Sequence, residues 1–495
     1  MTVKDIFTFK SEQTKMLHLA WIAFFISFFT WFNMAPLAST MIETTGWLTG
    51  DHLAALAIVN VALTIPARII VGKLLDRYGP RRVYSGLLIA MAIPTFAFAF
   101  GNSFMQLLIS RLLLSSIGAS FVVGIRMVSE WFPPKSVGMA EGIYGGWGNF
   151  GSAAGAILLP WFALTMFGGD NGWRYAIAFT GLACLIYGVI FYILARDTPE
   201  GKVYEKPKNI AALEVSTWKD MALLILWTVP LYVALALVAW RLHDTGMVSD
   251  TILYVSYSLC LMFCIYQVYN ILKVNVPILK KGVPEDDRYK FKNVAALNST
   301  YFANFGAELA IISMLPMFFQ IMFSLSPAQA GLIASSFAFI NLIARPLGGY
   351  LSDRMNSRRN TMLVYMFGIS LGLVGMGMID SSWPLVLAVV MTVVTSMFIQ
   401  GAEGATFAVI PFVKKRLTGQ IAGMSGAYGN VGATVYLVLY TLVTPQQFFF
   451  ILAGGAFLSF LCCYFWLEEP KGSFADEYEL SSVDIEEKER KSTIA

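Results

Sequence analysis

Long apolar runs recur along the whole chain, and they constrain its fold more than any other feature. The first three lie at 16–40, 53–71 and 83–100, and each approaches the length that an α-helix needs to cross a hydrocarbon core. Hydrophobic residues make up 57% of the 495 residues and charged residues only 13%, which does not suit a water-soluble globule. Strands of a closed β-barrel would alternate apolar and polar residues, whereas these runs are continuously apolar. The sequence therefore predicts an all-α polytopic membrane protein.

Segment 197–292 interrupts the regular spacing of these runs. Twelve spans are predicted outside it, and two more lie within it, at 221–239 and 252–272. An even number of extra helices keeps all later basic connections on the same side of the membrane as the earlier ones. We therefore expect both extra runs to cross the membrane. An amphipathic hairpin on the membrane surface is the alternative. The predicted domains are a six-helix bundle at 1–196, this insertion at 197–292, a second six-helix bundle at 293–467 and a disordered acidic tail at 468–495.

Lysine and arginine gather in alternate connections between the predicted spans. They precede the first span, follow the second and fourth, and recur at 354–359 and 414–416, whereas 43–51, 101–103 and 380–382 contain none. Because such residues favour the cytoplasmic side, we expect an integral protein of the cell (inner or plasma) membrane with both termini cytoplasmic. The net charge of +4 does not indicate nucleic-acid binding, since the basic residues are confined to particular loops.

Two stretches of the chain occur twice. Segments 67–82 and 344–359 share Ala, Arg, Gly, Asp and further Arg residues at matched positions, with Arg68 opposite Arg345. Segments 145–151 and 426–432 match at nearly the same offset, with Asn149 opposite Asn430. Duplicated halves are common in transporters, whose substrate sites lie where the halves meet. The predicted fold is therefore two six-helix bundles related by a pseudo-two-fold axis and joined by the insertion.

The loop at 72–82 and its copy at 349–359 carry Gly, Asp and paired Arg residues. This pattern resembles the loop between helices 2 and 3 of the major facilitator superfamily. Positive charge at these places could serve only to anchor the loops, but the matched spacing favours a conformational latch. In that superfamily the Asp and Arg groups bridge neighbouring helices in one transport state. The resemblance implies gating roles, without substrate contact, for Asp76, Arg77, Asp353 and Arg354.

Arg68 and Arg345 lie inside apolar helices, where an arginine costs about 2.5 to 3.5 kcal/mol on insertion scales unless a partner compensates it. The repeat places both at equivalent depths, so both can point into a central cavity. Guanidinium suits planar oxyanions because its forked donors form paired hydrogen bonds. We expect the two to clamp a small anion. A buried structural salt bridge for each is the alternative, although neither helix offers an acidic residue on the same face.

Small residues and an asparagine line one face of two further predicted helices. Gly145, Gly148 and Asn149 follow helical spacing, and Gly426, Gly429 and Asn430 reproduce it. Close helix packing would explain the glycines, but it does not explain an asparagine at the same place in both copies. We expect each amide to donate a hydrogen bond to the anion.

These stretches resemble a known family. Segment 140–151 and its second-half counterpart are similar to the two nitrate-signature stretches of the nitrate/nitrite porters, and the similarity covers nearly the whole chain apart from the insertion. Cyanobacterial nitrate permeases and high-affinity algal and plant nitrate transporters look closest. The resemblance implies nitrate and nitrite as substrates, held by the two arginines between aromatic residues. Those aromatic positions correspond to Phe32, Phe121, Tyr301 and Phe305, while the two extra helices depart from the usual twelve.

Uptake of an anion must be driven, because the membrane potential opposes it by about 2.3 kcal/mol per 100 mV per charge. A protonatable group near the site would couple protons to transport. Glu308 is the first candidate, since it shares one helical face with Tyr301 and Phe305. Glu130 and Glu403 are rival proton carriers, and a permanent ion pair of Glu308 with Arg68, Arg111 or Arg126 is the alternative.

The sequence contains no Walker-type phosphate loop, no Ser/His/Asp set and no metal-ligand cluster, and its five cysteines lie in apolar runs. We therefore expect no enzyme activity and no cofactor. The predicted partners are nitrate, nitrite, protons and the lipid bilayer. A one-for-one nitrate/nitrite exchanger and a non-transporting nitrate receptor remain alternatives. Phosphate or an organic acid is the rival substrate, but the lack of further cationic groups near the two arginines favours a monovalent anion.

Overall fold

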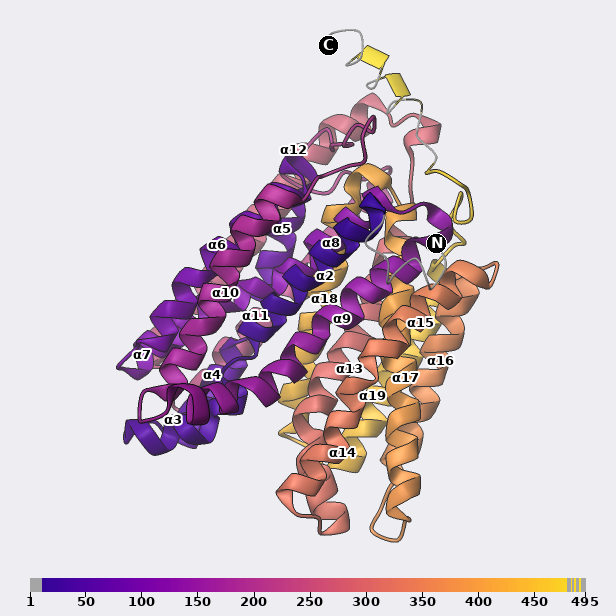
Figure 1. Cartoon of the computed structure of the whole chain (residues 1–495). Coiled ribbons are helices and arrows are strands. Elements are labelled where there is room, and N and C mark those ends of the chain that lie inside the picture. The colour runs from indigo at the N-terminus through magenta and orange to yellow at the C-terminus, as the bar shows by residue number, and fades with distance from the viewer. Residues whose placement is uncertain (1–10, 479–481, 483–484, 487–488, 491–495) are drawn as a thin grey trace.

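The computed structural model describes residues 11–478, 482, 485–486 and 489–490, and no β-strand occurs among them (Figure 1). Within this part of the chain, 13 helical segments are long and apolar enough to cross a membrane. The segment α18 (Thr418–Tyr440), rich in Gly, Ser and Thr, is not one of these 13, yet it is buried between α5 and α13. The predicted all-α fold of two bundles with two extra helices is confirmed.

The first bundle comprises six spans, several of which are broken into shorter helices. Its elements are α2 (Glu12–Trp31), η1 (Ala35–Leu37), α3 (Ala38–Thr45), α4 (Gly50–Val59), α5 (Thr64–Tyr78), α6 (Pro80–Ala99), α7 (Phe104–Leu114), η2 (Ser115–Ala119), α8 (Ser120–Trp131), α9 (Pro134–Trp161), η3 (Phe162–Phe167) and α10 (Gly172–Leu194).

The second bundle is built in the same way. Its elements are α13 (Phe291–Phe323), α14 (Pro327–Phe339), α15 (Asn341–Arg354), α16 (Arg358–Gly377), α17 (Leu385–Val409), η5 (Ile410–Phe412), η6 (Lys415–Leu417), α18 and α19 (Pro445–Trp466). The insertion contributes α11 (Trp218–Asp244), α12 (Asp250–Lys281) and η4 (Glu285–Asp287). Helix α11 contacts α5 of the first bundle and α13 and α18 of the second, whereas α12 packs mainly on α11.

Side-chain caps fix many of the helix starts. Thr49 forms a capping box with His52 at the start of α4, and Ser326 and Thr444 form similar boxes at α14 and α19. Thr217 begins α11 by accepting a hydrogen bond from the backbone N–H of Asp220 at 3.1 Å. Polar residues in the short connections thus set where the apolar helices begin.

Two spans are broken beside the centre of the molecule. Residues 60–63 separate α4 from α5, and Ile340 separates α14 from α15. At the first break, Trp31 Nε1 donates to the carbonyl of Asn60 at 2.7 Å, and the backbone N–H of Leu63 donates to Ser115 Oγ at 3.1 Å. Backbone groups released by the break are thereby satisfied inside the protein, as a membrane interior requires.

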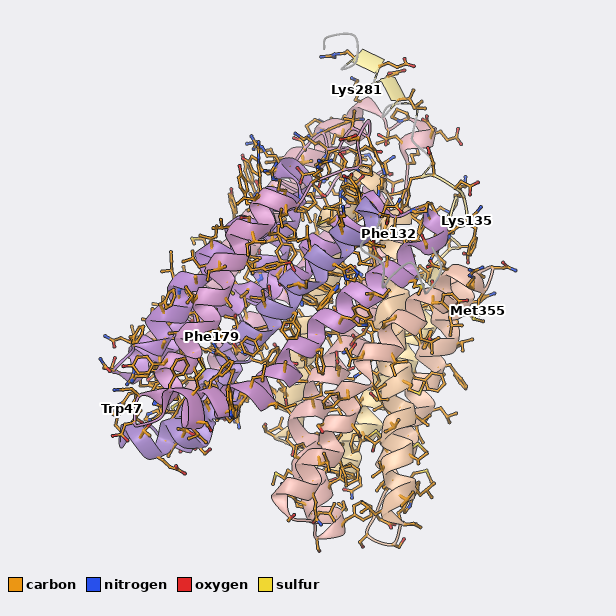
Figure 2. The ribbon with its side chains drawn as sticks, in the orientation of Figure 1. Trp47, Phe132, Lys135, Phe179, Lys281 and Met355 are labelled. Atoms are coloured by element: carbon orange, nitrogen blue, oxygen red, sulfur yellow. The ribbon has the colours of Figure 1, made fainter. Side chains whose placement is uncertain are left out.

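The two bundles lean together at one end and diverge toward the other (Figure 1). We call the closed end the basic end, because it carries the connections at 72–82, 354–359 and 414–416. Lys135, Met355 and Lys281 all lie at this end, while Trp47 lies at the opposite one (Figure 2). The main contacts between the bundles are those of α5 with α18 and of α9 with α15.

The chain after α19 runs across the basic end. Glu469 accepts a hydrogen bond from the backbone N–H of Arg358 at 2.9 Å, Phe474 lies 5.5 Å from the Arg358 guanidinium, and Asp476 pairs with Lys135 at 2.6 Å. The tail predicted to be disordered from residue 468 therefore makes specific contacts in its first part, because its carboxylates meet basic loops. Residues 479–481, 483–484, 487–488 and 491–495 lie outside the described part.

Candidate functional site

Arg68 lies fully buried on α5, one turn after the break that precedes this helix. Its Nε donates to the carbonyl of Gly118 at 3.1 Å, and its Nη1 donates to the carbonyl of Gly426 on α18. Gly118 belongs to η2, a short 3₁₀ segment. Among the described residues, no carboxylate lies within ion-pair distance of Arg68. Its charge is therefore held by carbonyl dipoles, by aromatic faces and by the Tyr301 hydroxyl.

Arg345 occupies the equivalent place on α15, also the fifth residue after a break, and is 1% exposed. Its partners differ from those of Arg68. Nη1 pairs with Glu403 Oε2 on α17 at 2.6 Å, and Nη2 donates to the Tyr301 hydroxyl at 3.2 Å. The salt bridge that the sequence left as an alternative therefore exists for Arg345 alone, and its acid comes from another helix of the same bundle.

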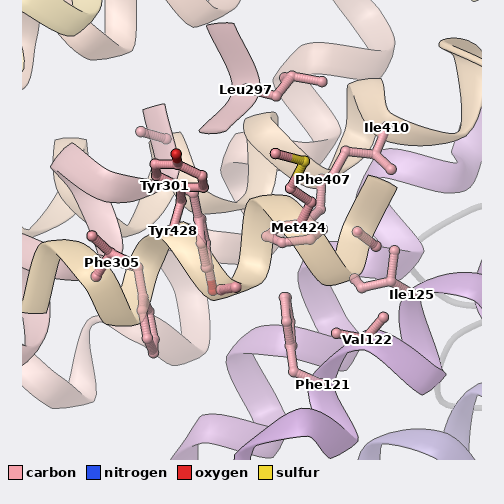
Figure 3. Close-up of a cluster of buried hydrophobic side chains, with 14 of the residues drawn as sticks. Phe121, Val122, Ile125, Leu297, Tyr301, Phe305, Phe407, Ile410, Met424 and Tyr428 are labelled. Atoms are coloured by element: carbon pink, nitrogen blue, oxygen red, sulfur yellow. The ribbon is translucent and has the colours of Figure 1, made fainter. Parts of the chain in front are cut away.

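Aromatic rings separate and surround the two guanidinium groups. The Phe121 ring from α8 lies 5.6 Å from the Arg68 Cζ and 5.0 Å from the Arg345 Cζ. It is stacked parallel to Tyr301, with centroids 6.1 Å apart, and Tyr301 is stacked on Phe305 at 5.0 Å. Figure 3 shows Phe121 of the first bundle facing these side chains of the second. The rings supply electron-rich faces for both cations.

Phe32 does not enter this aromatic group. Its ring contacts Phe28 and Trp31 near the end of α2. Phe24, two helical turns earlier, instead contacts Phe121 at 5.3 Å and stacks on Tyr144 at 5.0 Å. Phe407 meets the rings of Phe121 and Tyr301 edge-on, with centroids 4.5 and 4.7 Å away. The residues missed from sequence are therefore Phe24, Tyr144 and Phe407. Phe24 could have been found, because Phe24, Phe28 and Phe32 share one helical face.

Repeated glycines give the arginines room to cross between bundles. A Cβ at Gly145 of α9 would lie 2.5 Å from Arg345 Nε, and one at Gly426 of α18 would lie 3.1 Å from Arg68 Cδ. Each glycine thus belongs to the bundle opposite its arginine. The repeated signature therefore makes space for the two cations, in addition to permitting close helix approach.

Asn149 and Asn430 lie on the same faces of α9 and α18. Asn149 is 7% exposed and Asn430 is fully buried. Asn430 Nδ2 makes a long hydrogen bond of 3.4 Å to the Gly426 carbonyl, and the Oδ1 atoms of both side chains have no partner within the described structure. Both amides thus lie on helices that contact the two arginines, and within the described residues neither forms a hydrogen bond with an arginine.

Two of the three predicted proton carriers lie beside Arg345. Glu308 Oε1 accepts from Asn341 Nδ2 at 2.7 Å and from Gln400 Nε2 at 3.4 Å. The Glu308 and Glu403 side chains also interact directly. Glu130 instead pairs with Arg126 at 3.0 Å at the basic end. The structure therefore brings Glu308 and Glu403 into the site and places Glu130 in the contact between the bundles.

The predicted gating carboxylates make symmetrical contacts across the basic end. Asp76 accepts from the backbone N–H groups of Gly419 and Gln420, both at 2.9 Å, at the start of α18. Asp353 accepts from Gly138 at 3.1 Å and Met139 at 2.8 Å in the first turns of α9. Each bundle therefore places a carboxylate on backbone N–H groups near the start of a helix of the other, where the helix dipole favours a negative charge.

The arginines of this end have unequal roles. Arg77 and Arg354 are exposed and lie over the neighbouring Tyr78 and Tyr350 rings. Arg358 is instead buried, pairs with Asp353 at 2.8 Å and donates to the Pro134 carbonyl at 2.7 Å. Arg126 makes the corresponding contact in the other half, with Nε 3.9 Å from Asp76 and Nη1 donating to the Lys415 carbonyl.

The fold and this buried charged centre define the class of protein: a membrane carrier made of two related six-helix bundles. Two solved structures share the fold. The human organic anion transporter MFSD10 has a TM-score of 0.61 at 14% identity, covering 92% of this chain and 100% of its own. The proton:xylose symporter XylE has a TM-score of 0.61 at 14% identity, covering 93% and 97%.

The sequence comparisons are more specific. The Major Facilitator Superfamily pattern matches residues 20–281 and 297–492. The nitrate/nitrite transporter NrtP of Picosynechococcus sp. is 45% identical over 94% of this chain and 95% of its own length, and NrtP of Nostoc punctiforme is 44% identical over 96% of each. High-affinity nitrate transporter 2.3 of Oryza sativa subsp. japonica is 28% identical over 96% and 83%. This chain belongs to the nitrate/nitrite porter family of the major facilitator superfamily.

Proposed function

We propose that the protein is a secondary active transporter that carries nitrate and nitrite across the cell membrane by alternating access. The two NrtP relatives bear the name nitrate/nitrite transporter and match the chain over nearly its whole length. The chain is an integral membrane protein of the same fold, with buried arginines at the junction of its halves. These observations support the substrate class and the location of its site.

The observation that carries the proposal is the difference between the two arginines. Arg345 has a carboxylate partner at 2.6 Å, whereas within the described structure Arg68 is held by carbonyl groups, aromatic rings and the Tyr301 hydroxyl and has no ion pair. With one proton on Glu308 or Glu403, the site therefore has one net positive charge, which suits a monovalent anion. A planar oxyanion accepts paired hydrogen bonds from a guanidinium fork and fits against the Phe121 ring.

The same charges support coupling to protons. Arg68, Arg345, Glu308 and Glu403 are together neutral when both acids are ionised, so a bound nitrate leaves one negative charge in a buried place. One proton on the Glu308–Glu403 pair restores neutrality. A second proton per cycle would make inward movement electrically favourable against the membrane potential. We therefore propose proton-coupled uptake with Glu308 and Glu403 as the carriers.

Orientation follows from the positions of the basic residues. We infer that the basic end and both termini face the cytoplasm. The Asp76 and Asp353 contacts then close the cytoplasmic side while the bundles diverge on the other side. Releasing those contacts is the step that would deliver the anion inward.

Uptake of labelled nitrate into proteoliposomes tests the function. We expect accumulation of nitrate when the outside is acidic and the inside negative, without any anion inside, and competition by nitrite but not by phosphate. Uptake that requires internal nitrite and ignores the pH gradient would establish an exchanger. Saturable binding without uptake would establish a receptor.

A further inference from the structure

A cavity of about 420 Å³ lies at the basic end, between the insertion and the start of α18. Lys281, at the end of α12, marks this region in Figure 2. The floor is formed by the buried residues Glu214, Ser216, Asp287 and Arg416, and its rim includes the exposed Lys208 and Lys281. The substrate site described above contributes none of these residues.

The cavity has a surplus of positive charge. Asp287 pairs with Lys208 at 3.2 Å and also with Lys414 and Arg416, and Arg416 pairs with Glu214 at 2.9 Å. Burial would raise the pKa of Asp287, but Arg416 and Lys414 hold it well below its usual value. Of the residues that line the cavity, three cations (Lys208, Lys281 and Arg416) therefore face two carboxylates (Glu214 and Asp287).

The cavity also lies at a definite depth in the membrane. Helix α12 exposes apolar side chains such as Leu261 and Ile265 as far as Leu272, and the exposed lysines Lys273, Lys280 and Lys281 follow them. Exposed apolar residues on an outer helix face hydrocarbon, and terminal lysines extend to the headgroup layer. The cavity beside Lys281 therefore lies on the polar side of the hydrocarbon boundary, toward the lipid headgroups.

We propose that this cavity binds a phosphate-bearing anion, and that its location makes the headgroup of an anionic phospholipid the natural source. The phosphate oxygens would be bound by Lys208 and Lys281 at the rim, above the Asp287–Arg416 pair. Arg416 lies two residues before α18, whose first turn donates backbone hydrogen bonds to Asp76 at the closed end. A bound headgroup would contact both the insertion and the chain just before α18, and so strengthen the packing between them. This binding does not depend on which anion the protein transports.

Purified full-length protein in a neutral detergent tests this proposal. Lipid binding is followed by native mass spectrometry and by the thermal unfolding midpoint, with phosphatidylglycerol, phosphatidylcholine and inorganic phosphate as separate probes. We compare the parent with the Lys208→Gln/Lys281→Gln double variant. Lys280→Gln is the matched control, because Lys280 is exposed on the same helix end and does not line the cavity.

We expect phosphatidylglycerol to bind the parent and the control alike, and the double variant at least about tenfold more weakly, since only the double variant loses two charge-assisted hydrogen bonds to the phosphate oxygens. Stabilisation of the parent by inorganic phosphate to the same extent would identify a free phosphate as the ligand of the same site. Equal phosphatidylglycerol binding by parent and double variant, or equal effects of phosphatidylglycerol and phosphatidylcholine, would overturn the proposal.

Discussion

Arg68 and Arg345 occupy matching positions in the repeat, yet their environments are not equivalent. The repeat itself predicted that both lie at the junction of the bundles. It could not predict that Glu403 pairs with only one of them, because Glu403 lies on α17, which carries no recognisable copy of the motif. Phe24 was missed for a similar reason. The sequence indicated an aromatic face on α2, but which residue of that face contacts Phe121 depends on how the helices pack.

The paired carboxylates allow a prediction about pH. Glu308→Gln removes the charge that faces Glu403 but leaves the Arg345–Glu403 pair, so we expect uptake that no longer depends on the pH gradient. Glu403→Gln leaves the Arg345 charge without its partner, and we expect the nitrate uptake rate to fall by more than about tenfold. Uptake into proteoliposomes at several pH values measures both, with the exposed Glu43→Gln as control. A Glu308→Gln variant with the parent's pH dependence would exclude Glu308 from coupling.

The two asparagines allow a prediction about selectivity. Asn149→Ala and Asn430→Ala each remove an amide from the site faces of α9 and α18, and a lost hydrogen bond of about 1 kcal/mol corresponds to about fivefold. We expect the nitrate-to-chlorate uptake ratio to change by about this factor, while protein levels remain constant. The exposed Asn102→Ala is the control. Unchanged ratios in both variants would mean that the amides serve helix packing alone.

At the scale of elements, the closed basic end depends on close backbone contact. A Cβ at Gly72 would lie 3.1 Å from the carbonyl carbon of Gly419, and one at Gly349 would lie 3.1 Å from the backbone nitrogen of Met139. The sequence motif predicted a latch at these loops. It could not predict which residues the latch contacts, since the first turns of α9 and α18 belong to the opposite bundle in each case.

We therefore expect Gly349→Ala to open the basic end. Spin labels at the exposed positions 135 and 355, one on each bundle, would report a longer distance by double electron–electron resonance than in the parent (Figure 2). The five native cysteines would be replaced in all variants. Gly86→Ala is the control, since a Cβ there meets nothing within 4 Å. Superimposable distance distributions would argue against a latch at this contact.

The insertion is fastened to α18 through Asp287. Its folded pKa is below its unfolded value of about 3.9, so its contribution to stability is complete above about pH 4 and declines as the pH falls further. We expect Asp287→Asn to reduce the free energy of unfolding at neutral pH by about 1–3 kcal/mol, less than for a fully buried pair because the cluster borders solvent. Thermal unfolding against pH measures this, with Glu285→Gln as control. Equal stability of Asp287→Asn and parent at neutral pH would contradict it.

For the whole molecule, hydrophobic runs, basic connections and the internal repeat were enough to predict two six-helix bundles with two extra helices. The role of the insertion was not predictable, because α11 contacts both bundles through apolar surfaces that resemble any lipid-facing helix in sequence. The contacts of the first part of the acidic tail were not predictable either, since Glu469 and Asp476 meet their basic partners only in the folded chain.

The central claim is that Arg68 and Arg345 bind the anion between the bundles. Equilibrium binding of nitrate to the purified protein tests it most directly, using the parent, Arg68→Lys and Arg345→Lys, with folding checked by thermal unfolding. Lysine keeps the charge but loses the forked donors, so the account predicts saturable binding to the parent and at least about tenfold weaker binding to each variant. Nitrate affinities of both folded variants equal to that of the parent would contradict it.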